Sequence, residues 1–285
     1  MDMKEVCAEE KARSFRADVH IHSEYSHDSV CSVSDIIQAG KEKQMDVLCI
    51  TDHCDLHYGL TATELLESRK QIVMNIARSA AECKEIKILT GIELGGGFFM
   101  PEIAQSLTDS QLFDMVIGSV HSILFRGERT STGKFDFGSA DEKTMLEFFD
   151  SYMDATVYVA ENLDIDVLGH LTYIFRHING KYQKNLDWRI QEDKIRRIFR
   201  ALIARNIALE INTSCLGSFY DEWMPAKEIV DVYIEMGGTL FTLGSDAHIS
   251  EKIGNGFEVV RTYLRQKGIS DLVYFEKRIP HKYKI

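Results

Sequence analysis

The chain has 285 residues, of which 45% are hydrophobic and 27% are charged, and only three are proline. This length and composition predict a fully folded chain with one sizeable core, and they exclude a Pro-rich linker or a disordered arm. The formal net charge of -11 argues against a nucleic-acid backbone as the main partner, because binding one requires a basic stripe. Carboxylates that bind divalent cations are neutralised by them, so this formal charge overstates the field that an anionic substrate would meet.

Cysteine spacing and hydropathy bear on where the protein functions. The six cysteines include no CxxC pair and no regular framework, and the N-terminal sequence MDMKEVCAEEK has no apolar core for secretion. No apolar run approaches the roughly 20 residues that are needed to cross a bilayer. We therefore expect a soluble protein in a reducing cytoplasm, with no membrane partner, and the sequence leaves its oligomeric state open.

Short apolar runs alternate with longer segments of helical period, which is typical of βα units around a parallel sheet. The expected strands are 17–22, 47–51, 88–94, 115–120, 167–169, 208–211 and 240–244. The expected helices are 33–44, 61–86, 141–162, 191–205, 225–236 and 257–267. Together they predict a single α/β domain over residues 1–285, with a short N-terminal extension at 1–16 and a C-terminal tail at 268–285.

Local signals support several of these helix starts. Ser32 with Asp35, and Thr61 with Glu64, have the spacing of capping boxes, and Pro225 stands where a first-turn proline is tolerated. Two expected connections, 122–140 and 172–189, are long for an α/β domain. Such long loops are more often functional than idle, so we expect them to border a site.

Imidazole and carboxylate side chains follow most of the expected strands. The first strand contains His20 and His22, which the period of a strand points to one side, where two imidazoles can share a metal. Later strands run into Thr51-Asp52-His53, Gly91-Ile92-Glu93, Gly118-Ser119-Val120-His121, Gly169-His170 and Gly244-Ser245-Asp246-Ala247-His248. A lone histidine is more often a buried core residue, but active sites of parallel barrels lie at the C-terminal strand ends, where all of these residues fall.

The motifs HxH, TDH, GIE, SVH, GH and SDAH occur in this order over nearly the whole chain. This set resembles the polymerase and histidinol phosphatase superfamily of metal-dependent phosphoesterases. The resemblance implies a distorted (β/α)7 barrel, like a TIM barrel, that holds about three divalent metal ions. Nitrogen and oxygen ligands without thiolates suit zinc, iron and manganese alike, so the residue types do not select one of them.

The resemblance also implies a ligand for each metal. One metal would be bound by His20, His22, Glu93 and Asp246, a second by Glu93, His121 and His170, and a third by Asp28, His53 and His248. Glu93 would bridge the first two metals. The family's third-metal ligand near the first motif is here Asp28 rather than a histidine, and the neighbouring His27 is the alternative.

Within this superfamily, the length, single domain and long loops look most like histidinol phosphatases, which hydrolyse L-histidinol phosphate in histidine biosynthesis. We expect a metal-bound hydroxide to attack phosphorus without a phosphoenzyme, because divalent ions lower the pKa of bound water and neutralise the departing oxygen. Asp246 and His248 are metal-linked candidates for proton transfer. His27, His177 and water are alternatives for this role.

A phosphate-binding arginine is implied in the loop after the fifth strand, where Arg176 offers a guanidinium fork suited to phosphate. Arg126 and Arg129 are weaker candidates. The segment after the sixth strand, with Asn212-Thr213-Ser214, departs from the family pattern, in which a basic residue would follow soon. Here no basic residue occurs before Lys227, so the second phosphate contact is unassigned.

Three other functions share part of this pattern. A nucleotide or nucleic-acid phosphoesterase of the same superfamily would share every metal ligand and differ in a loop contact to a base. An amidohydrolase-type deaminase also opens with HxH and closes with an aspartate, but it usually bridges its metals through fewer ligands. A non-catalytic metal-binding barrel would not turn over any phosphomonoester. We expect a small phosphorylated metabolite as the partner.

Overall fold

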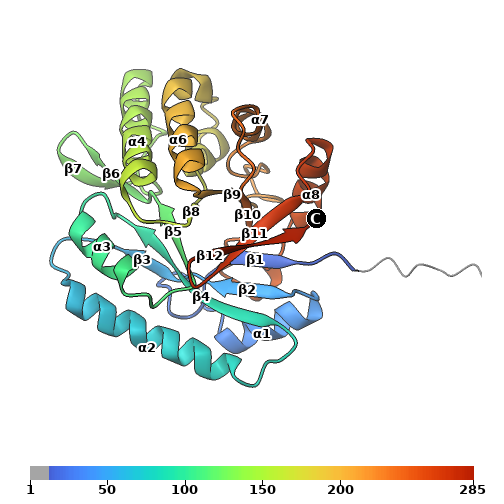
Figure 1. The fold of residues 1–285 in the computed structure, drawn as a ribbon. Helices are drawn as coiled ribbons and strands as arrows, with labels where there is room; N and C mark the ends of the chain where they lie inside the picture. Colours follow the sequence, from blue (N-terminus) through green and yellow to red (C-terminus); the bar gives the residue numbers. More distant parts are fainter. Residues whose placement is uncertain (1–12) are drawn as a thin grey trace, which may run out of the picture.

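The computed structural model describes residues 13–285, so most of the predicted extension at 1–16 lies outside the described residues. One sheet of parallel strands forms the centre, in the order β1-β2-β4-β5-β8-β9-β10, and the short strand β3 also pairs with β4. The bounds are β1 Ala17–Ile21, β2 Val47–Ile50, β3 His53–Asp55, β4 Lys87–Gly95, β5 Met115–Ser119, β8 Val167–Leu168, β9 Ala208–Asn212 and β10 Phe241–Gly244. Helices surround the sheet, which explains the continuous apolar runs of its strands (Figure 1).

The two edges of the sheet meet and close the barrel. Ile21 of β1 forms a parallel bridge with Ala247, just beyond β10. The amide of His22 donates to the carbonyl oxygen of Ala247 at 2.9 Å, and the amide of Asp246 donates to that of His20 at 2.8 Å. The predicted distorted seven-stranded α/β barrel in a single domain is therefore confirmed.

The helices begin largely where the capping signals place them. Their bounds are α1 Val33–Glu42, α2 Ala62–Ala80, α3 Pro101–Asp109, α4 Glu142–Asn162, α6 Glu192–Arg205, α7 Lys227–Glu235 and α8 Phe257–Gln266. The hydroxyl of Ser32 accepts from the amide of Asp35, and that of Thr61 accepts from the amide of Glu64. Both predicted caps are thus confirmed, whereas α3 lies outside the predicted helices.

Two predicted helix bounds are wrong. Helix α2 ends at Ala80 rather than at residue 86, because the chain must return to the sheet, where the amide of Lys87 donates to Asp46 at 2.9 Å. Pro225 does not stand in the first turn of α7. Met224 pairs with Asn212 in an antiparallel bridge, so the chain is still extended just before Pro225, and α7 begins only at Lys227.

Both long connections contain regular structure. The first holds an antiparallel hairpin of β6 (Ser122–Phe125) and β7 (Glu128–Ser131). The second holds the short helix α5 (Tyr173–Phe175), the π-helical turn η1 (Arg176–Lys181) and the start of the 3-10 turn η2 (Trp188–Gln191). They leave the C-terminal ends of β5 and β8, so they border the same end of the barrel as the predicted site residues.

The predicted C-terminal tail is a hairpin of β11 (Asp271–Glu276) and β12 (Ile279–Lys284) that packs against the N-terminal ends of the strands. Figure 1 shows it crossing the barrel. Phe275 is buried, and the amide of Arg278 donates at 2.8 Å to Asp114, which directly precedes β5. The guanidinium of Arg278 also pairs with Asp166, which precedes β8. The hairpin therefore closes the end of the barrel opposite the predicted site.

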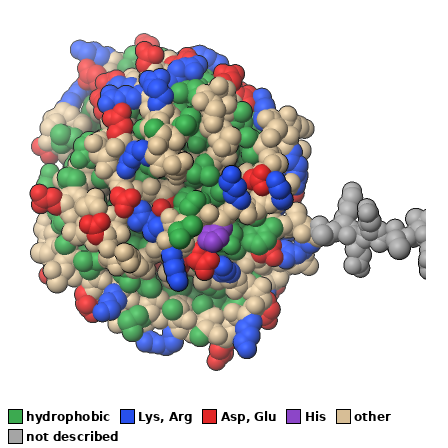
Figure 2. All heavy atoms as spheres, viewed as in Figure 1, with side chains coloured by type: hydrophobic (Ala, Val, Ile, Leu, Met, Phe, Trp, Pro, Cys, Tyr) green, Lys and Arg blue, Asp and Glu red, His purple; other side chains and the backbone are tan. Residues whose placement is uncertain are grey.

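The outer surface carries charges of both signs. Figure 2 shows basic and acidic side chains interspersed over the face seen in Figure 1, rather than a continuous basic stripe. Among residues 13–285, no helix has both the length and the apolar character to span a membrane.

Candidate metal centre

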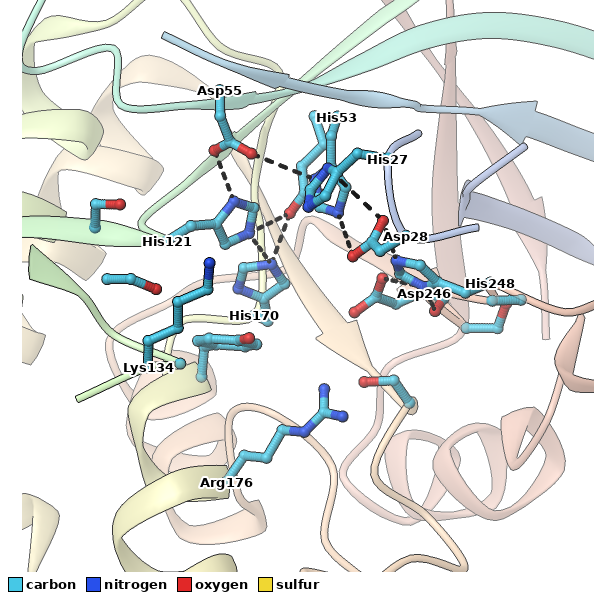
Figure 3. A pocket seen from close by; sticks show the side chains of 18 of the residues that line it. His27, Asp28, His53, Asp55, His121, Lys134, His170, Arg176, Asp246 and His248 are labelled. Atoms are coloured by element: carbon cyan, nitrogen blue, oxygen red, sulfur yellow. Dashed lines mark hydrogen bonds and ion pairs between the residues drawn. The ribbon is translucent and has the colours of Figure 1, made fainter. Parts of the chain in front are cut away.

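The predicted site residues gather at the C-terminal ends of the barrel strands. Most of them line a pocket of about 900 Å³ that the two long connections also border (Figure 3), while His20 and His22 are fully buried. The set brought together is His20, His22, Asp28, His53, Glu93, His121, His170, Asp246 and His248. The strand order thus assembles residues that are far apart in the sequence.

Glu93, on β4, is buried at the centre of this set. Its Oε1 lies 2.7 Å from Nε2 of His170 and 3.0 Å from Nε2 of His121. Its Oε2 lies 2.7 Å from Nδ1 of His53 and 3.5 Å from Nε2 of His20. The two oxygens therefore face different groups of imidazoles, as a bridging carboxylate would.

A second carboxylate, that of Asp246, follows β10. Its Oδ1 lies 3.1 Å from Nε2 of His22, 3.7 Å from Nε2 of His20 and 3.6 Å from Nδ1 of His248. The ligand atoms of His20, His22 and Asp246 all lie within 4.8 Å of one another. One metal ion with bonds of about 2 Å can span such a group.

Two further groups have the same spacing. The ligand atoms of Glu93, His121 and His170 lie within 4.8 Å of one another, as do those of His22, His53 and His248. Asp28 approaches the latter group from the loop after β1, with 3.5 Å between its Oδ2 and Nε2 of His53 and 3.3 Å between its Oδ1 and Nε2 of His248. Asp28 thus lies between these two histidines, whereas the side chain of His27 is 75% exposed and its ring centroid lies 5.3 Å from that of His53.

Partners behind the histidines fix the orientation of their rings. Nδ1 of His20 lies 2.6 Å from Oε1 of Glu210, and Nδ1 of His121 lies 3.0 Å from Oδ1 of Asp55. In both rings Nε2 is then directed to the central carboxylates. Metal-binding histidines have this arrangement, in which an outer partner sets the tautomer and the ring angle.

Several central atoms have no hydrogen-bond partner among residues 13–285. These buried atoms are Nε2 of His20, Nε2 of His22, Nδ1 of His53 and Oε2 of Glu93. Nδ1 of His53 approaches Oε2 of Glu93 to 2.7 Å, yet without hydrogen-bond geometry. Leaving such a group unpaired costs about 1–3 kcal/mol. Because imidazole and carboxylate are the ligands that zinc, iron and manganese accept, the residues present fit divalent metal ions.

The electrostatics of the cluster also suit a cation. Burial alone would raise the pKa of Glu93, but the facing histidines, led by His121, hold it well below its usual range. Burial alone would lower the pKa of His53, whereas Glu93 and Asp28 raise it to about 10. Glu93 is therefore anionic, and it draws positive charge onto His53. A divalent ion would supply that charge in place of the protons.

Comparison with known proteins identifies the family. The PHP domain family matches residues 18–214, which is more than half of the chain. The chain belongs to the PHP domain family. A protein of Lactococcus lactis subsp. lactis named "Histidinol-phosphatase" is 30% identical to it, over 91% of this chain and 94% of the relative. A protein of Clostridium acetobutylicum named "Probable histidinol-phosphatase" is 29% identical, over 92% of this chain and 97% of the relative.

A solved structure has a similar fold. The crystal structure of histidinol phosphate phosphatase from Lactococcus lactis, described as complexed with zinc, L-histidinol and phosphate, matches with a TM-score of 0.71. Its sequence identity is 24%, and the match covers 93% of this chain and 98% of that chain. The predicted superfamily and its barrel fold are thus confirmed.

Glu210, on β9, contacts two histidines of the cluster and lies outside the predicted set. Its Oε1 faces Nδ1 of His20, and its Oε2 accepts from the amide of His170 at 2.7 Å. It is fully buried and positions both of these histidines. It is the one charged side chain in β9, and a charged residue in a buried strand is the sequence signal that could have indicated it.

Asp55, on β3, is a second residue outside the predicted set. Its ligand atom lies within 4.8 Å of those of His53 and His121. Strand β3 pairs Asp55 with Gly95 of β4 and so brings it to the end of the barrel. Because β3 has only three residues and no apolar run, nothing in the sequence pattern indicates this placement.

The three basic residues predicted near the substrate have different surroundings. Arg176, on η1, lines the pocket (Figure 3). Arg129 also lines it, but its guanidinium donates to the carbonyl oxygen of Leu56 at 2.6 Å. Arg126 pairs with Glu147 of α4 instead and is not among the residues that line the pocket. Of the three, Arg176 is the one that lines the pocket without a hydrogen bond or an ion pair to residues 13–285.

We predict that Glu93→Gln empties two metal sites together. The substitution removes the negative charge of Glu93, whose one oxygen faces His20 and whose other oxygen faces His121 and His170. Metal analysis of the purified proteins should give about three ions per parent chain and about one per variant chain. The exposed Glu128→Gln is the control, and a variant that retains full metal content would contradict the bridging role.

We predict that Glu210→Ala weakens metal binding without unfolding the barrel. The substitution leaves Nδ1 of His20 without its partner, and lost outer partners typically cost about 10–100-fold in metal affinity. Competition with a chromophoric chelator measures that affinity, and the melting curve of the metal-free protein reports folding. Glu210→Gln keeps an oxygen toward His20 and should lose less. Equal affinity in parent and Glu210→Ala would remove Glu210 from the site.

Proposed function

We propose that this PHP domain is a metal-dependent phosphomonoesterase that hydrolyses L-histidinol phosphate to L-histidinol and phosphate in histidine biosynthesis. The observation that carries the proposal is the cluster of imidazoles around buried Glu93, which opens into a pocket bordered by Arg176. The relative from Lactococcus lactis that is 30% identical over nearly the whole chain bears the name of this activity. The solved structure with the same fold contains zinc, L-histidinol and phosphate.

We infer that the centre holds about three divalent ions, of zinc, iron or manganese. The proposed ligands are His20, His22, Glu93 and Asp246 for one ion, Glu93, His121 and His170 for a second, and Asp28, His53 and His248 for a third. The short distances within each group support this division. Bound there, such ions lower the pKa of a coordinated water and neutralise phosphate oxygens.

The side chains around the ions would bind the phosphate and move protons. Arg176 would hold two phosphate oxygens with its guanidinium fork. Asp246 and His248 are the candidates for proton transfer, because both line the pocket. The anionic Asp246 would accept a proton, and the departing alkoxide would be protonated by His248 or by water. Ser214 is a poor nucleophile, since its hydroxyl donates to Asn212 at 2.7 Å. Direct attack of water on phosphorus, without a phosphoenzyme, is therefore the mechanism that we propose.

The substrate would be a small metabolite that the pocket of about 900 Å³ can enclose. Another phosphomonoester, including a nucleotide, would use the same metal ligands and differ only in the contacts of its alcohol. A location in the cytoplasm and the lack of a nucleic-acid or membrane partner stay predictions from the sequence.

A substrate panel tests the proposal directly. We expect the metal-loaded protein to release inorganic phosphate fastest, by kcat/KM, from L-histidinol phosphate among histidinol phosphate, phosphoserine, phosphotyrosine, glycerol phosphate and nucleotides. The metal-free protein should release none, because the metals activate the water. Preference for a nucleotide would reassign the substrate within the PHP family. No release from any phosphoester would reject the phosphatase function.

We predict that Arg176→Ala raises KM for L-histidinol phosphate by at least about tenfold, because it removes a charge-assisted contact worth about 1.5–3 kcal/mol. Stability should change little, since the guanidinium is at the pocket wall and not in the core. Steady-state kinetics and a melting curve measure the two effects. Arg126→Ala, on the outer surface, is the matched control, and equal kinetics in Arg176→Ala and this control would place the phosphate contact elsewhere.

A further inference from the structure

Two cationic side chains enter the pocket beside His121 and His170. Figure 3 shows Lys134 extending toward these two histidines and Arg176 reaching into the same space from another segment. Among residues 13–285, neither charged group has a hydrogen bond or an ion pair, and the guanidinium of Arg176 lies 5.9 Å from the ring centroid of Tyr173. Unpaired cations that share one pocket wall indicate an anionic ligand.

The turn that carries Lys134 is anchored to His121 and to the core. Both the amide and the hydroxyl of Thr132 donate to the carbonyl oxygen of His121 at 2.9 Å. Three residues beyond Lys134, the ring of Phe137 packs at 5.0 Å from that of Phe148 on α4. Thr132 and Phe137 are fully buried. The turn that carries the exposed Lys134 is therefore held in place by contacts on both sides of it.

The segment that carries Arg176 is anchored in a similar manner, to His170 and to the core. The amide of Tyr173 donates to the carbonyl oxygen of His170 at 2.8 Å, and the buried Phe175 packs at 5.2 Å from Phe149 of α4. His121 and His170 both face Oε1 of Glu93, and each begins a segment that carries one cation into the pocket. The two segments thus place their charges on the same side of the cluster.

We propose that Lys134 is the second phosphate-binding cation of this site and acts together with Arg176 over the group of Glu93, His121 and His170. The inference rests on the proposed function. No basic residue lies between Ser214 and Lys227, so the segment after β9 offers no cation to the phosphate. A phosphomonoester carries about two negative charges and three acceptor oxygens at neutral pH, so it can bind a second cation besides Arg176.

The other cations of the pocket fit this role less well. Arg69 and Arg129 donate to the carbonyl oxygens of His53 and Leu56 and hold those loops in place. Lys252, on the turn η3 (Ser250–Lys252), also lines the pocket, but its segment follows His248 at the other side of the cluster. Lys252 is therefore the competing candidate that an experiment must separate from Lys134.

Binding of inorganic phosphate tests the inference without depending on turnover. Calorimetric titration of the zinc-loaded protein with inorganic phosphate should show Kd rising about tenfold in Lys134→Ala, as expected for one lost charge-assisted contact. Lys134→Arg should restore most of the affinity, because it keeps the charge. Lys252→Ala and the exposed Lys143→Ala should bind phosphate like the parent. Zinc content and melting temperature, measured on every variant, report the state of the metal site and of the fold.

Kinetics provide a second readout. With L-histidinol phosphate, Lys134→Ala should raise KM and the inhibition constant of inorganic phosphate together, while inhibition by L-histidinol, which has no phosphate, stays unchanged. Parent-like phosphate affinity in Lys134→Ala, a loss in Lys252→Ala instead, or no recovery in Lys134→Arg would overturn the inference. If phosphate binding depends on Lys134 but histidinol phosphate is not hydrolysed, the proposed function fails while the role of Lys134 stands.

Discussion

The site depends on the burial of one carboxylate, that of Glu93, among imidazoles from several strands. Burial of an anion is costly unless opposite charge compensates it, and Glu93 is only 1% exposed. His121 and His170 approach one of its oxygens, and His53 approaches the other. These histidines come from separate strand ends, so the closed barrel is what brings the compensating groups to Glu93. The cluster is consequently incomplete until the barrel has formed.

The barrel divides its two ends between function and stability. At the C-terminal end, unpaired buried nitrogens and oxygens meet around Glu93, which is an arrangement that costs stability without a cation. At the opposite end, the hairpin of β11 and β12 buries Phe275 and joins Arg278 to Asp114 and Asp166 beside two strands. The contacts at the closed end therefore stabilise the fold, while the side chains at the open end are arranged to bind ligands.

Sequence patterns predict the parallel strands and the metal-binding set, because a strand end in a βα unit has a fixed place in the barrel. They do not predict the hairpin of β11 and β12. Its turn places Lys277 and Arg278 at positive φ, where Asn-Gly would be the recognisable signal, and contacts with Asp114 hold it there. Glu210 is a different case, because its charge in a buried strand is visible in the sequence but its role is not. Its strand is correctly placed, but its role depends on contacts with His20 and His170 that only the assembled barrel creates.

A chain with a net charge of -11 can bind a phosphate ester only if its field is reversed locally. Burial would raise the pKa of Asp246, but His20 and His22 hold it below its usual range, so this part of the site is anionic. That charge would repel a phosphate, yet it is also what attracts divalent ions. Once such ions are held, the floor of the pocket becomes positive, and Arg176 and Lys134 extend the positive field along its wall. The acidic composition and an anionic substrate are therefore compatible, because the carboxylates act on the substrate through the cations that they hold.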